Sequence, residues 1–402
     1  MSNSTSNETF ETNATVLSRA QAIQQQLITW RRTLHQQPEL GFQEYKTAQY
    51  VAQELSALGI EFRAGVGTTG IVAEIYSEQP GKLIALRADM DALPILETND
   101  CDYASQVPGN MHACGHDAHT AMLLGAATLF AQHPPQRGGV RFIFHPCEET
   151  QDDEGFSGAY RMLLEGAMTD VDAVLALHVT PMHPAGKVSY DAAISASVDN
   201  FGCILRGPGG HASMPHRSVD LGMVLGMLLT GLYALVPRSV DPLHAATLTV
   251  GAVHGGDTHN VIPSEITLQG TLRTRSPQAH AAALRAVDQV VAMARATGAG
   301  CEWTWARGAL PVSLNNTALL QTMLRSAQEL LGQDCIGGDA ELGLGGEDFS
   351  FFANAAPGAM LYLGTQLTGH GDWHTPNFDV DEAALPMGAA ILYDSAARLL
   401  SV

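Results

Sequence analysis

The sequence predicts a mainly parallel α/β domain that carries a second, smaller α+β domain as an insertion. Up to about residue 188, short apolar runs rich in β-branched residues alternate with helical tracts. From about residue 189 the pattern changes to that of antiparallel strands with two long helices, and an apolar strand and a long helix of the first kind then return. At 402 residues the chain is too long for one ordinary core. We therefore expect a polar, disordered amino terminus (1–15), a first domain built from 16–188 and 308–402, and an inserted domain (189–307).

Two helices open the first domain. Residues 15–40 have helical spacing that stops at Pro38, and residues 44–60 form a second helical tract closed by Gly59. Helices of this kind usually flank a sheet.

Three strands follow, in the segments 82–94, 138–149 and 171–181, each short and apolar as expected of a strand buried on both faces. Helical tracts at 119–133 and 158–168 separate them, which is the order of a parallel sheet. Ligands bind such sheets outside the carboxyl ends of the strands. The residues expected at those ends are Asp91, Glu148, Glu149 and His178.

The inserted domain contains strand patterns at 200–213, 245–256 and 265–274 and helical patterns at 219–236 and 277–298. A four-stranded antiparallel sheet with two helices on one face accounts for this order. The chain then returns to the first domain with a buried strand at 359–365 and a capped helix within 374–400.

Composition restricts the class of partner. The net charge is −20, which argues against nucleic acid or an anionic membrane, because both require basic surface. No apolar run reaches about 18 residues, so we expect no membrane span, and the first dozen residues lack the basic start and apolar stretch of a signal peptide. We expect a cytoplasmic protein. Its six cysteines form no CxxC pair, so reduced thiols are the default.

Residues 111–123, "MHACGHDAHTAML", place potential metal ligands at the start of a helix. Cys114 and His116 can both point inward if a turn precedes the helix, since a regular helix would separate their directions by about 200°. Thiolate, imidazole and carboxylate ligands favour a divalent transition metal over calcium or magnesium. His112 and His119 are better explained as helix caps or as hydrogen-bond partners of the ligands.

The pair Glu148 and Glu149 follows a buried strand. Adjacent carboxylates repel, so both stay ionised most easily if one binds a cation and the other faces a water. An isolated pair of this kind is usually a solvated turn, but its place at the end of an apolar strand favours a site. Taken alone, His178 is as compatible with a buried structural residue as with a ligand, and His374, in a loop before a helix, favours a structural role.

Several of these motifs together resemble one known family. The segments "RADMDALP", "MHACGHDAHTAMLLGAA", "HPCEE", "LALHV", "GPGGHASMPH", "GGDTHNVIP", "GTLRT", "GGEDFSFF" and "HTPNFDVDE" occur in the order and approximate spacing of the M20 metallopeptidases. The resemblance is to the amidohydrolase branch, which includes hippurate hydrolases, auxin-conjugate hydrolases and N-acyl-amino acid aminoacylases. It covers the chain from about Arg31 to the carboxyl terminus.

The resemblance implies a binuclear metal site in the first domain, which would be the catalytic domain, with the inserted domain as a satellite. Cys114 resembles the bridging ligand of that family and Glu148 its general acid and base, while Asp91 resembles the carboxylate that orients a histidine ligand. The remaining implied metal ligands are His116, Glu149, His178 and His374. In the wider family a histidine stands where this chain has Asp89, a departure that fits the amidohydrolase branch.

In the satellite domain, three residues resemble groups that contact the substrate. His211 is similar to a histidine placed over the scissile carbonyl, and Asn260 and Arg273 are similar to substrate-binding residues. A guanidinium can bind an amino acid carboxylate with two hydrogen bonds, although a strand-surface role for Arg273 stays open. The resemblance also implies a homodimer that pairs through the satellite domains.

The expected reaction is hydrolysis of the amide bond of an N-acyl amino acid to a carboxylic acid and a free amino acid, by a water that bridges two metals and is activated by Glu148. His211 and one metal would stabilise the oxyanion. Mn²⁺ or Zn²⁺ is expected, with Co²⁺ or Ni²⁺ as alternatives. The other readings are a dipeptidase or carboxypeptidase, a metal hydrolase for esters or carbamoyl amides, and a metal-binding protein without catalysis.

Overall fold

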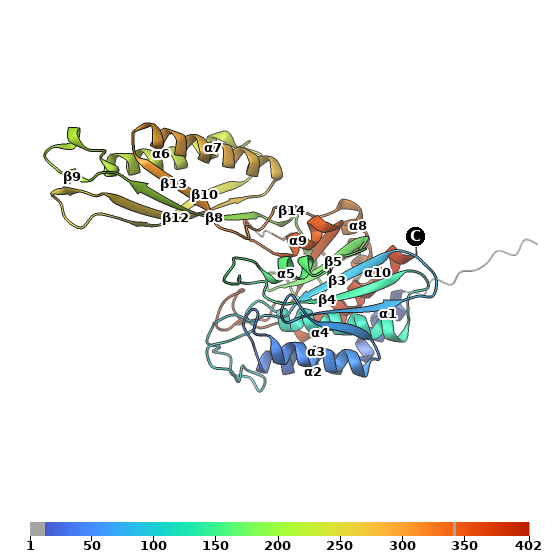
Figure 1. Cartoon of the computed structure of the whole chain (residues 1–402). Helices are drawn as coiled ribbons and strands as arrows, with labels where there is room; N and C mark the ends of the chain where they lie inside the picture. Colours follow the sequence, from blue (N-terminus) through green and yellow to red (C-terminus); the bar gives the residue numbers. More distant parts are fainter. Residues whose placement is uncertain (1–12, 341–342, 402) are drawn as a thin grey trace, which may run out of the picture.

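The computed structural model of the chain describes residues 13–340 and 343–401, and it contains two bodies (Figure 1). The larger body is built on an eight-stranded sheet and the smaller one on a four-stranded sheet. This confirms the predicted fold class, a mainly parallel α/β domain with an α+β insertion. The predicted disorder of the first residues falls almost entirely outside the described residues.

The eight-stranded sheet has the order β1-β2-β4-β3-β5-β16-β6-β15. Its central strands β4, β3, β5 and β16 run parallel to one another, whereas β2 is antiparallel to β4 and β6 is antiparallel to β16. The strands are β1 (Glu61–Val66), β2 (Gly70–Tyr76), β3 (Leu83–Asp89), β4 (Gly139–His145), β5 (Ala173–Thr180), β6 (Val188–Tyr190), β15 (Ile336–Asp339) and β16 (Gly358–Gly364).

The three predicted central strands are present as β3, β4 and β5, and all of their residues are buried. They are shorter than the apolar segments, so Asp91, Glu148 and Glu149 lie just beyond a strand end. The hairpin of β1 and β2 was not predicted. Most of β1 is solvent-exposed, and it therefore lacks the apolar run by which the central strands are recognised.

The helices of the larger body differ from the prediction at the first helix, and the helices at 317–331 and 349–355 were not predicted. The single helix expected at the start is two helices, α1 (Asn13–Ala22) and α2 (Gln24–Gln36), divided at Ile23, whose N–H bonds the carbonyl of Ala20 three residues back. The others are α3 (Tyr45–Ala57), α4 (His116–Gln132), α5 (Gly158–Leu164), α8 (Thr317–Leu331), α9 (Phe349–Ala355) and α10 (Leu385–Leu400), with short 3-10 turns at Gln333–Cys335 and Glu382–Ala384.

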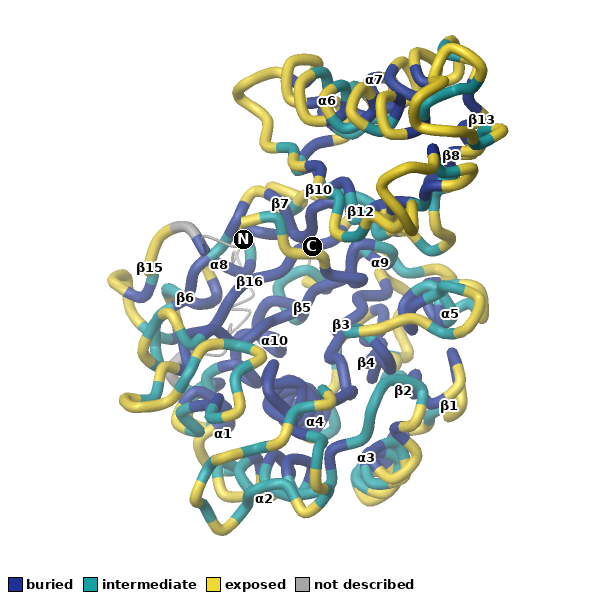
Figure 2. The backbone as a smooth tube through the Cα atoms, turned by 90° about the vertical axis from the view of Figure 1, so that its left-hand side faces the viewer, coloured by how far each residue is buried: buried dark blue, intermediate teal, exposed yellow. Residues whose placement is uncertain are grey.

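Helix α4 lies inside the larger body, where Figure 2 shows it in dark blue beneath the strands. Every residue from His116 to Phe130 is buried. The helix packs against α2, α10 and β3, so it is apolar on all sides instead of on one stripe. The start of α4, where the predicted ligands lie, is therefore held by core packing on all sides.

The smaller body has a four-stranded antiparallel sheet in the order β10-β12-β8-β13. Helices α6 (Leu221–Ser239) and α7 (Pro277–Ala296) cover one face of it (Figure 1) and close a separate hydrophobic core. The strands are β8 (Ser197–Arg206), β10 (Ala246–His254), β12 (Glu265–Thr274) and β13 (Gly300–Trp305). A two-stranded ribbon of β9 (Gly210–His211) and β11 (Val261–Ile262) lies near a 3-10 turn, Pro215–Arg217, and the pair β7 (Ala193–Ser195) and β14 (Ser313–Leu314) lies between the bodies.

Helix α6 is long and apolar enough to cross a membrane by length and composition alone. The sequence was expected to contain no such segment. One of its faces packs into the core of the smaller body through Leu221, Val224, Leu228, Leu232 and Val236. Its other face carries exposed Met223, Met227 and Tyr233.

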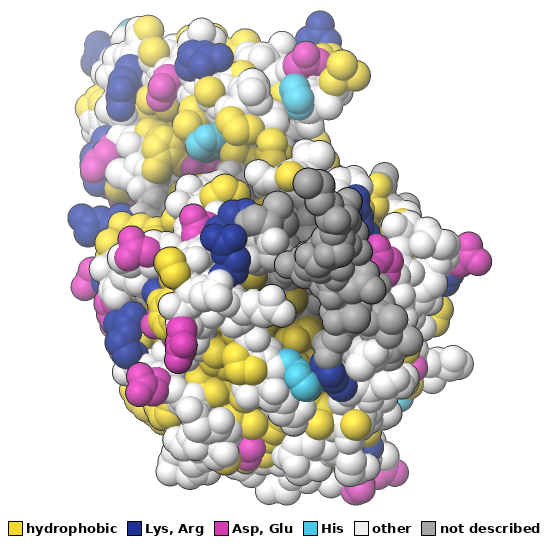
Figure 3. Space-filling model, turned by 90° about the vertical axis from the view of Figure 1, so that its right-hand side faces the viewer, with side chains coloured by type: hydrophobic (Ala, Val, Ile, Leu, Met, Phe, Trp, Pro, Cys, Tyr) yellow, Lys and Arg dark blue, Asp and Glu magenta, His cyan; other side chains and the backbone are white. Residues whose placement is uncertain are grey.

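Charged side chains are scattered over the surface. On the face shown in Figure 3, lysine and arginine are interspersed with acidic and neutral side chains and form no continuous basic stripe.

Candidate metal centre

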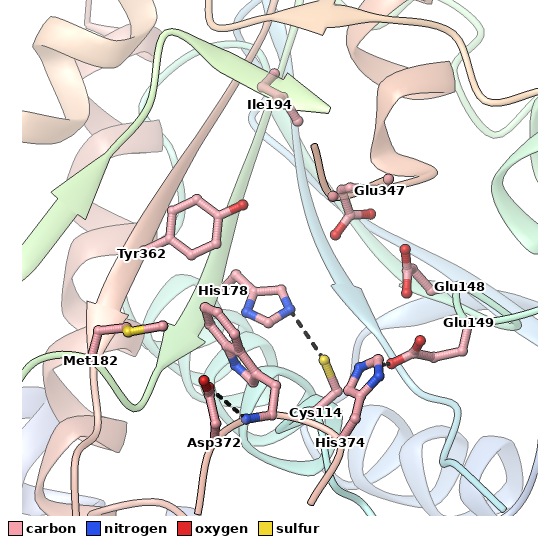
Figure 4. Close-up of a pocket in the computed structure, with 13 residues that line it drawn as sticks. Cys114, Glu148, Glu149, His178, Met182, Ile194, Glu347, Tyr362, Asp372 and His374 are labelled. Atoms are coloured by element: carbon pink, nitrogen blue, oxygen red, sulfur yellow. Dashed lines mark hydrogen bonds and ion pairs between the residues drawn. The ribbon is translucent and has the colours of Figure 1, made fainter. Parts of the chain in front are cut away.

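The carboxyl ends of β3, β4 and β5 and the start of α4 meet at one place, and the structure brings seven of the ten predicted site residues together there. They are Asp91, Cys114, His116, Glu148, Glu149, His178 and His374. Figure 4 shows those that line a cavity, which are Cys114, Glu148, Glu149, His178 and His374. Strand ends and a helix start supply six of them, and the loop after β16 supplies His374. Groups of three with ligand atoms within 4.8 Å of one another include Cys114, His116 and His178, and also Cys114, Glu149 and His374.

Cys114 and His116 are aimed into the site by the turn at Gly115, which has the left-handed φ of 91° and precedes the first residue of α4. A Cβ on Gly115 would overlap the side chain of Val179 in β5. Glycine is therefore required both for the backbone conformation and for the close approach to β5. As a result, Cys114 Sγ lies 3.7 Å from His178 Nε2.

Asp91 connects His116 with Glu149. Its Oδ1 lies 3.2 Å from Nδ1 of His116, and its Oδ2 accepts the backbone N–H of Glu149 at 3.0 Å. The proton on Nδ1 of His116 therefore points at a carboxylate, and Nε2 is left facing the site without a hydrogen-bond partner. Asp91 therefore orients the imidazole of His116 through Nδ1, the nitrogen on the opposite side of the ring from Nε2.

Glu149 and His374 come from distant parts of the chain and meet with His374 Nε2 3.1 Å from Glu149 Oε1. His374 has an unusual positive φ of 61°, and its N–H is held by the carbonyl of Ala113, next to Cys114. This conformation is costly for a residue other than glycine, so the surrounding loop must fix it.

His178 is oriented by its neighbours. Its Nδ1 donates to the carbonyl of Val179 at 2.7 Å, which leaves Nε2 directed at Cys114. The N–H of Val179 donates to Nε2 of His119 at 2.8 Å, and Nδ1 of His119 donates to Asp89 at 2.6 Å. His119 therefore contacts β5, which carries His178, through Nε2 and Asp89 of β3 through Nδ1, in agreement with the supporting role expected of it. His112 is buried, and neither of its ring nitrogens has a hydrogen-bond partner.

The pKa shifts of two predicted ligands favour the binding of a cation at the site. Burial lowers the pKa of His116, but the charges of Asp89 and Asp91 and the hydrogen bond to Asp91 outweigh burial and raise that pKa to about 10. Burial and then the charges of Glu149 and Glu148 raise the pKa of the Cys114 thiol well above its usual range. A divalent metal would replace the proton on His116 and stabilise the thiolate.

The donor set fits divalent transition metals. Among the described residues, Nε2 of His116 is buried and has no hydrogen-bond partner, and Oε1 of Glu149 is approached by Nε2 of His374, another predicted ligand, as expected of atoms that bind a metal. One sulfur, three imidazoles and carboxylate oxygens form a mixed set that suits zinc, manganese, cobalt or nickel better than calcium or magnesium. Two of the ligand groups share Cys114 and two share Glu149, so these side chains can serve two neighbouring ions.

Glu148 lies beside these ligands and binds differently from Glu149. The backbone N–H of Asp348 donates to its Oε1 at 3.4 Å. Burial, followed by the charges of Glu347 and Glu149, raises the pKa of Glu148 well above its usual range. A half-buried carboxyl with a raised pKa is suited to take up a proton and release it again.

A cavity of about 490 Å³ opens over these residues (Figure 4). One wall is apolar and aromatic, with Met182, Ile194, Tyr362 and Trp373, and acidic Glu347 and Asp372 also line the cavity. These residues were not predicted. Glu347 belongs to the quoted "GGEDFSFF" segment, and Tyr362 is the only polar side chain in strand β16, so both gave a signal in the sequence.

Behind the cavity, buried Arg87 in β3 connects several acids. Its guanidinium lies 2.8 Å from Asp89, 2.9 Å from Glu347 and 3.4 Å from Asp348. Since Asp348 in turn contacts Glu148 through its N–H, Arg87 fixes the acidic segment around Glu148. Sequence analysis gave no role to Arg87, because an arginine inside an apolar strand shows no local sign of its distant partners.

The structure does not bring His211, Asn260 or Arg273 into the cavity of the same chain. His211 is exposed, and Asn260 directly precedes β11, which pairs with β9, at the end of the smaller body that points away from the larger one (Figure 1). Arg273 lies at the other end of this body, where its Nη1 donates to the carbonyl of Leu344, next to the cavity-lining Gly345.

Comparisons with known proteins agree on one family. The model of peptidase family M20/M25/M40 matches residues 85–398. An N-acetyl-L-cysteine deacetylase of Bacillus subtilis is 37% identical over 383 residues, which cover 94% of this chain and 89% of the relative. The IAA-amino acid hydrolase ILR1-like 2 of Arabidopsis thaliana is 37% identical over 380 residues, with 93% and 85% covered.

A thermostable carboxypeptidase 2 of Saccharolobus solfataricus is 36% identical over 374 residues, which cover 91% of this chain and 93% of the relative. Among solved structures, the YXEP protein of Bacillus subtilis, described as a dinuclear metal binding peptidase from the M20 family, superposes with a TM-score of 0.81 at 33% identity. The superposition covers 95% of this chain and 99% of that structure.

Proposed function

The chain belongs to peptidase family M20/M25/M40, a family of metal-dependent hydrolases, and from this premise we propose that it cleaves the amide bond of N-acyl amino acids to a carboxylic acid and a free amino acid. One observation carries the proposal. Glu148, a half-buried carboxyl with a raised pKa, lies beside the ligand groups that share Cys114 and Glu149, at the floor of a cavity large enough for a small molecule.

The proposed ligands of two divalent metal ions are Cys114, His116, Glu149, His178 and His374, with Cys114 bridging. When bound, such ions would acidify a water and polarise the substrate carbonyl. Mn²⁺ or Zn²⁺ are the first candidates, with Co²⁺ or Ni²⁺ as alternatives. Asp91 orients His116 and fixes the backbone of Glu149, so it supports both ligands without touching the metals.

Glu148 is proposed as the general base and then the general acid. It takes the proton of the attacking water and delivers that proton to the nitrogen of the departing amino acid. Burial and the charges of Glu347 and Glu149 raise its pKa well above the usual range, which strengthens it as a base for the first transfer. The N–H of Asp348 and the Arg87 network hold the acidic segment in place during the two steps.

The substrate is proposed to lie with its acyl group against Met182, Ile194, Tyr362 and Trp373, because an acyl group without charge is compatible with an apolar wall. Glu347 and Asp372 favour a second candidate, a dipeptidase or carboxypeptidase, since these acids could accept hydrogen bonds from a free α-ammonium group. The two candidate functions use the same metals and the same base, Glu148. They differ in the substrate group that lies in this cavity, which is an acyl group in one and an α-ammonium group in the other.

We also propose that residues 16–188 and 308–402 form the catalytic domain and 189–307 the satellite domain, because each of these two domains has its own hydrophobic core.

A homodimer is proposed to form through the satellite domain. The smaller sheet ends at edge strand β10, which has a strand partner on one side only, and helix α6 exposes Met223, Met227 and Tyr233, so an open sheet edge and an apolar helix face are both available. In such a dimer, His211 and Asn260 could reach a partner's cavity, which they do not line in their own chain. We also propose that the protein is located in the cytoplasm.

The proposal is tested by combining metal analysis with a substrate panel. Purified protein is assayed for release of free amino acid from N-acetyl, N-benzoyl and indoleacetyl amino acids beside simple dipeptides, before and after chelation and after addition of manganese, zinc, cobalt or nickel. About two ions per chain with chelator-sensitive cleavage of N-acyl amino acids supports the amidohydrolase. Cleavage of dipeptides alone favours the second candidate, and an absence of metal-dependent hydrolysis would refute both.

A further inference from the structure

The turn that carries Glu148 and Glu149 is strained and tightly packed. After β4 ends at His145, Cys147 adopts a positive φ of 51°, a conformation that is costly for any residue other than glycine. The carbonyl of Cys147 accepts the N–H of Gly158 at 2.9 Å, and a Cβ on Gly158 would overlap the carbonyl oxygen of Pro146. Such a backbone conformation persists only where its surroundings fix it.

Glu44, at the start of α3, supplies one of these fixing contacts. Its Oε1 accepts the N–H of Cys147 at 2.8 Å, and its Oε2 accepts the hydroxyl of Thr69 at 2.5 Å. Its side chain does not cap α3, although Glu44 occupies the cap position. The residue is fully buried, and it forms no salt bridge within the described parts of the chain. A carboxyl group that is buried at this cost needs an explanation other than ion pairing.

Glu44 acts on the turn together with Asp91. Glu44 accepts the N–H of Cys147, and Asp91 accepts the N–H of Glu149, so two carboxyl groups bind the backbone on either side of Glu148. The direction in which Glu148 leaves the backbone is set by the peptide groups on both sides of it. Loss of the contact to Cys147 would free the strained side of the turn and would leave a buried N–H without a partner.

We propose that Glu44 is a positioning residue for the reaction: by binding the N–H of Cys147, it holds the strained turn so that Glu148 points at the attacking water, while Asp91 holds the backbone of Glu149. The inference rests on the proposed function, in which Glu148 is the base. A hydrogen-bond acceptor at this place, and not a negative charge, is the required feature. Burial, followed by the charge of Asp91, raises the pKa of Glu44 to about 7, and a protonated carboxyl still has one oxygen that can accept from Cys147.

Three substitutions test this role in the metal-loaded, full-length protein. Glu44→Gln keeps an acceptor oxygen at the same distance, Glu44→Asp withdraws it by one methylene, and Glu44→Ala removes it. Glu39→Ala is the matched control, because Glu39 lies on the same segment and accepts from Thr47 but does not contact the turn. The readouts are kcat and KM for the best N-acyl amino acid, metal content, and the melting temperature.

We expect kcat to fall by about 10- to 100-fold in the alanine and aspartate variants, since a shift of the base by roughly 1 Å costs this much. KM and metal content should change little, and Glu44→Gln should restore kcat to within about threefold of the wild type. A wild-type kcat in folded Glu44→Asp or Glu44→Ala would overturn the inference. So would a Glu44→Gln variant as impaired as alanine, because the charge would then be the required feature. A wild-type protein without metal-dependent hydrolysis would refute the proposed function itself.

Discussion

Oδ1 of Asp91 lies 3.2 Å from Nδ1 of His116, on the side of the imidazole that faces away from the predicted metal ligands. The same carboxylate accepts the N–H of Glu149 through its other oxygen. One buried side chain therefore sets the direction of two proposed ligands. Partners of this kind tune metal affinity by orienting ligands and raising their basicity.

Replacement of Asp91 should therefore weaken metal binding without unfolding the protein. Asp91→Ala is expected to lower the affinity for the more weakly held ion by about 10- to 100-fold, and Asp91→Asn by less, because an amide oxygen can still accept from His116. Titration of the apo-protein with Zn²⁺ or Mn²⁺ by calorimetry measures the change. Unchanged affinity in Asp91→Ala would show that His116 is held without it.

Cys114→Ala should lose metal itself, because the proposed bridging sulfur belongs to two ligand groups. We expect metal content to fall to about one ion per chain or less and hydrolysis to be lost, since a bridging ligand serves both positions. Cys101→Ala is the matched control, a partly exposed thiol outside the site. A Cys114→Ala protein with two ions and normal activity would remove the claim of a bridging ligand.

The proposed dimer depends on the exposed face of α6. Met223→Glu places a charge in that face and should shift sedimentation from dimer to monomer. Met293→Glu on α7 is the control, because Met293 and Met223 are both 54% exposed. If His211 acts across the dimer, the monomeric variant should also lose most of its kcat while it keeps its metals. Wild-type protein that sediments only as a monomer at working concentration would contradict the dimer.

Glu44 should make stability depend on pH. Its pKa in the folded protein, about 7, lies above the value of about 4.3 expected in the unfolded chain. The folded state therefore holds the proton more tightly, and the contribution of Glu44 to stability is present at low pH and is lost as pH rises to about 7. Compared with wild type, Glu44→Gln should gain up to about 3 kcal/mol in unfolding free energy between pH 4.5 and 8. Urea unfolding of the metal-free proteins checks this, and a constant difference across this range would rule it out.

The sequence allowed the fold class and the position of the site to be predicted for a physical reason. Parallel strands buried on both faces are continuous apolar runs, so a polar residue just beyond such a run, such as Asp91 or Glu148, marks the edge of the sheet. The family resemblance then added His374, whose loop has no local pattern that points to the site. It reaches Glu149 only because the chain returns to the sheet after the inserted domain.

Other features had no local signal. Glu44 and Arg87 read as ordinary charged residues, because the groups that compensate their burial lie far away in the chain. The exposed position of His211 at the far end of the smaller body depends on how the two bodies are joined, which neither strand patterns nor helix spacing contain. The metal class was predicted from ligand types and the amide-cleaving reaction from the family resemblance, whereas the residues of the cavity wall became visible only in three dimensions.

The most direct test of the central claim is the activity of Glu148→Gln measured together with its metal content. Glutamine is nearly isosteric with glutamate, and Glu148 is not among the five proposed metal ligands. The variant should therefore hold about as much metal as the wild type and bind N-acyl amino acids with a similar KM. Because glutamine cannot take up a proton, kcat should fall by about 10²- to 10⁴-fold. Glu78→Gln, on the exposed surface, should behave as the wild type. A metal-replete Glu148→Gln enzyme with wild-type kcat would contradict the assignment of Glu148 as the base and, with it, the proposed mechanism.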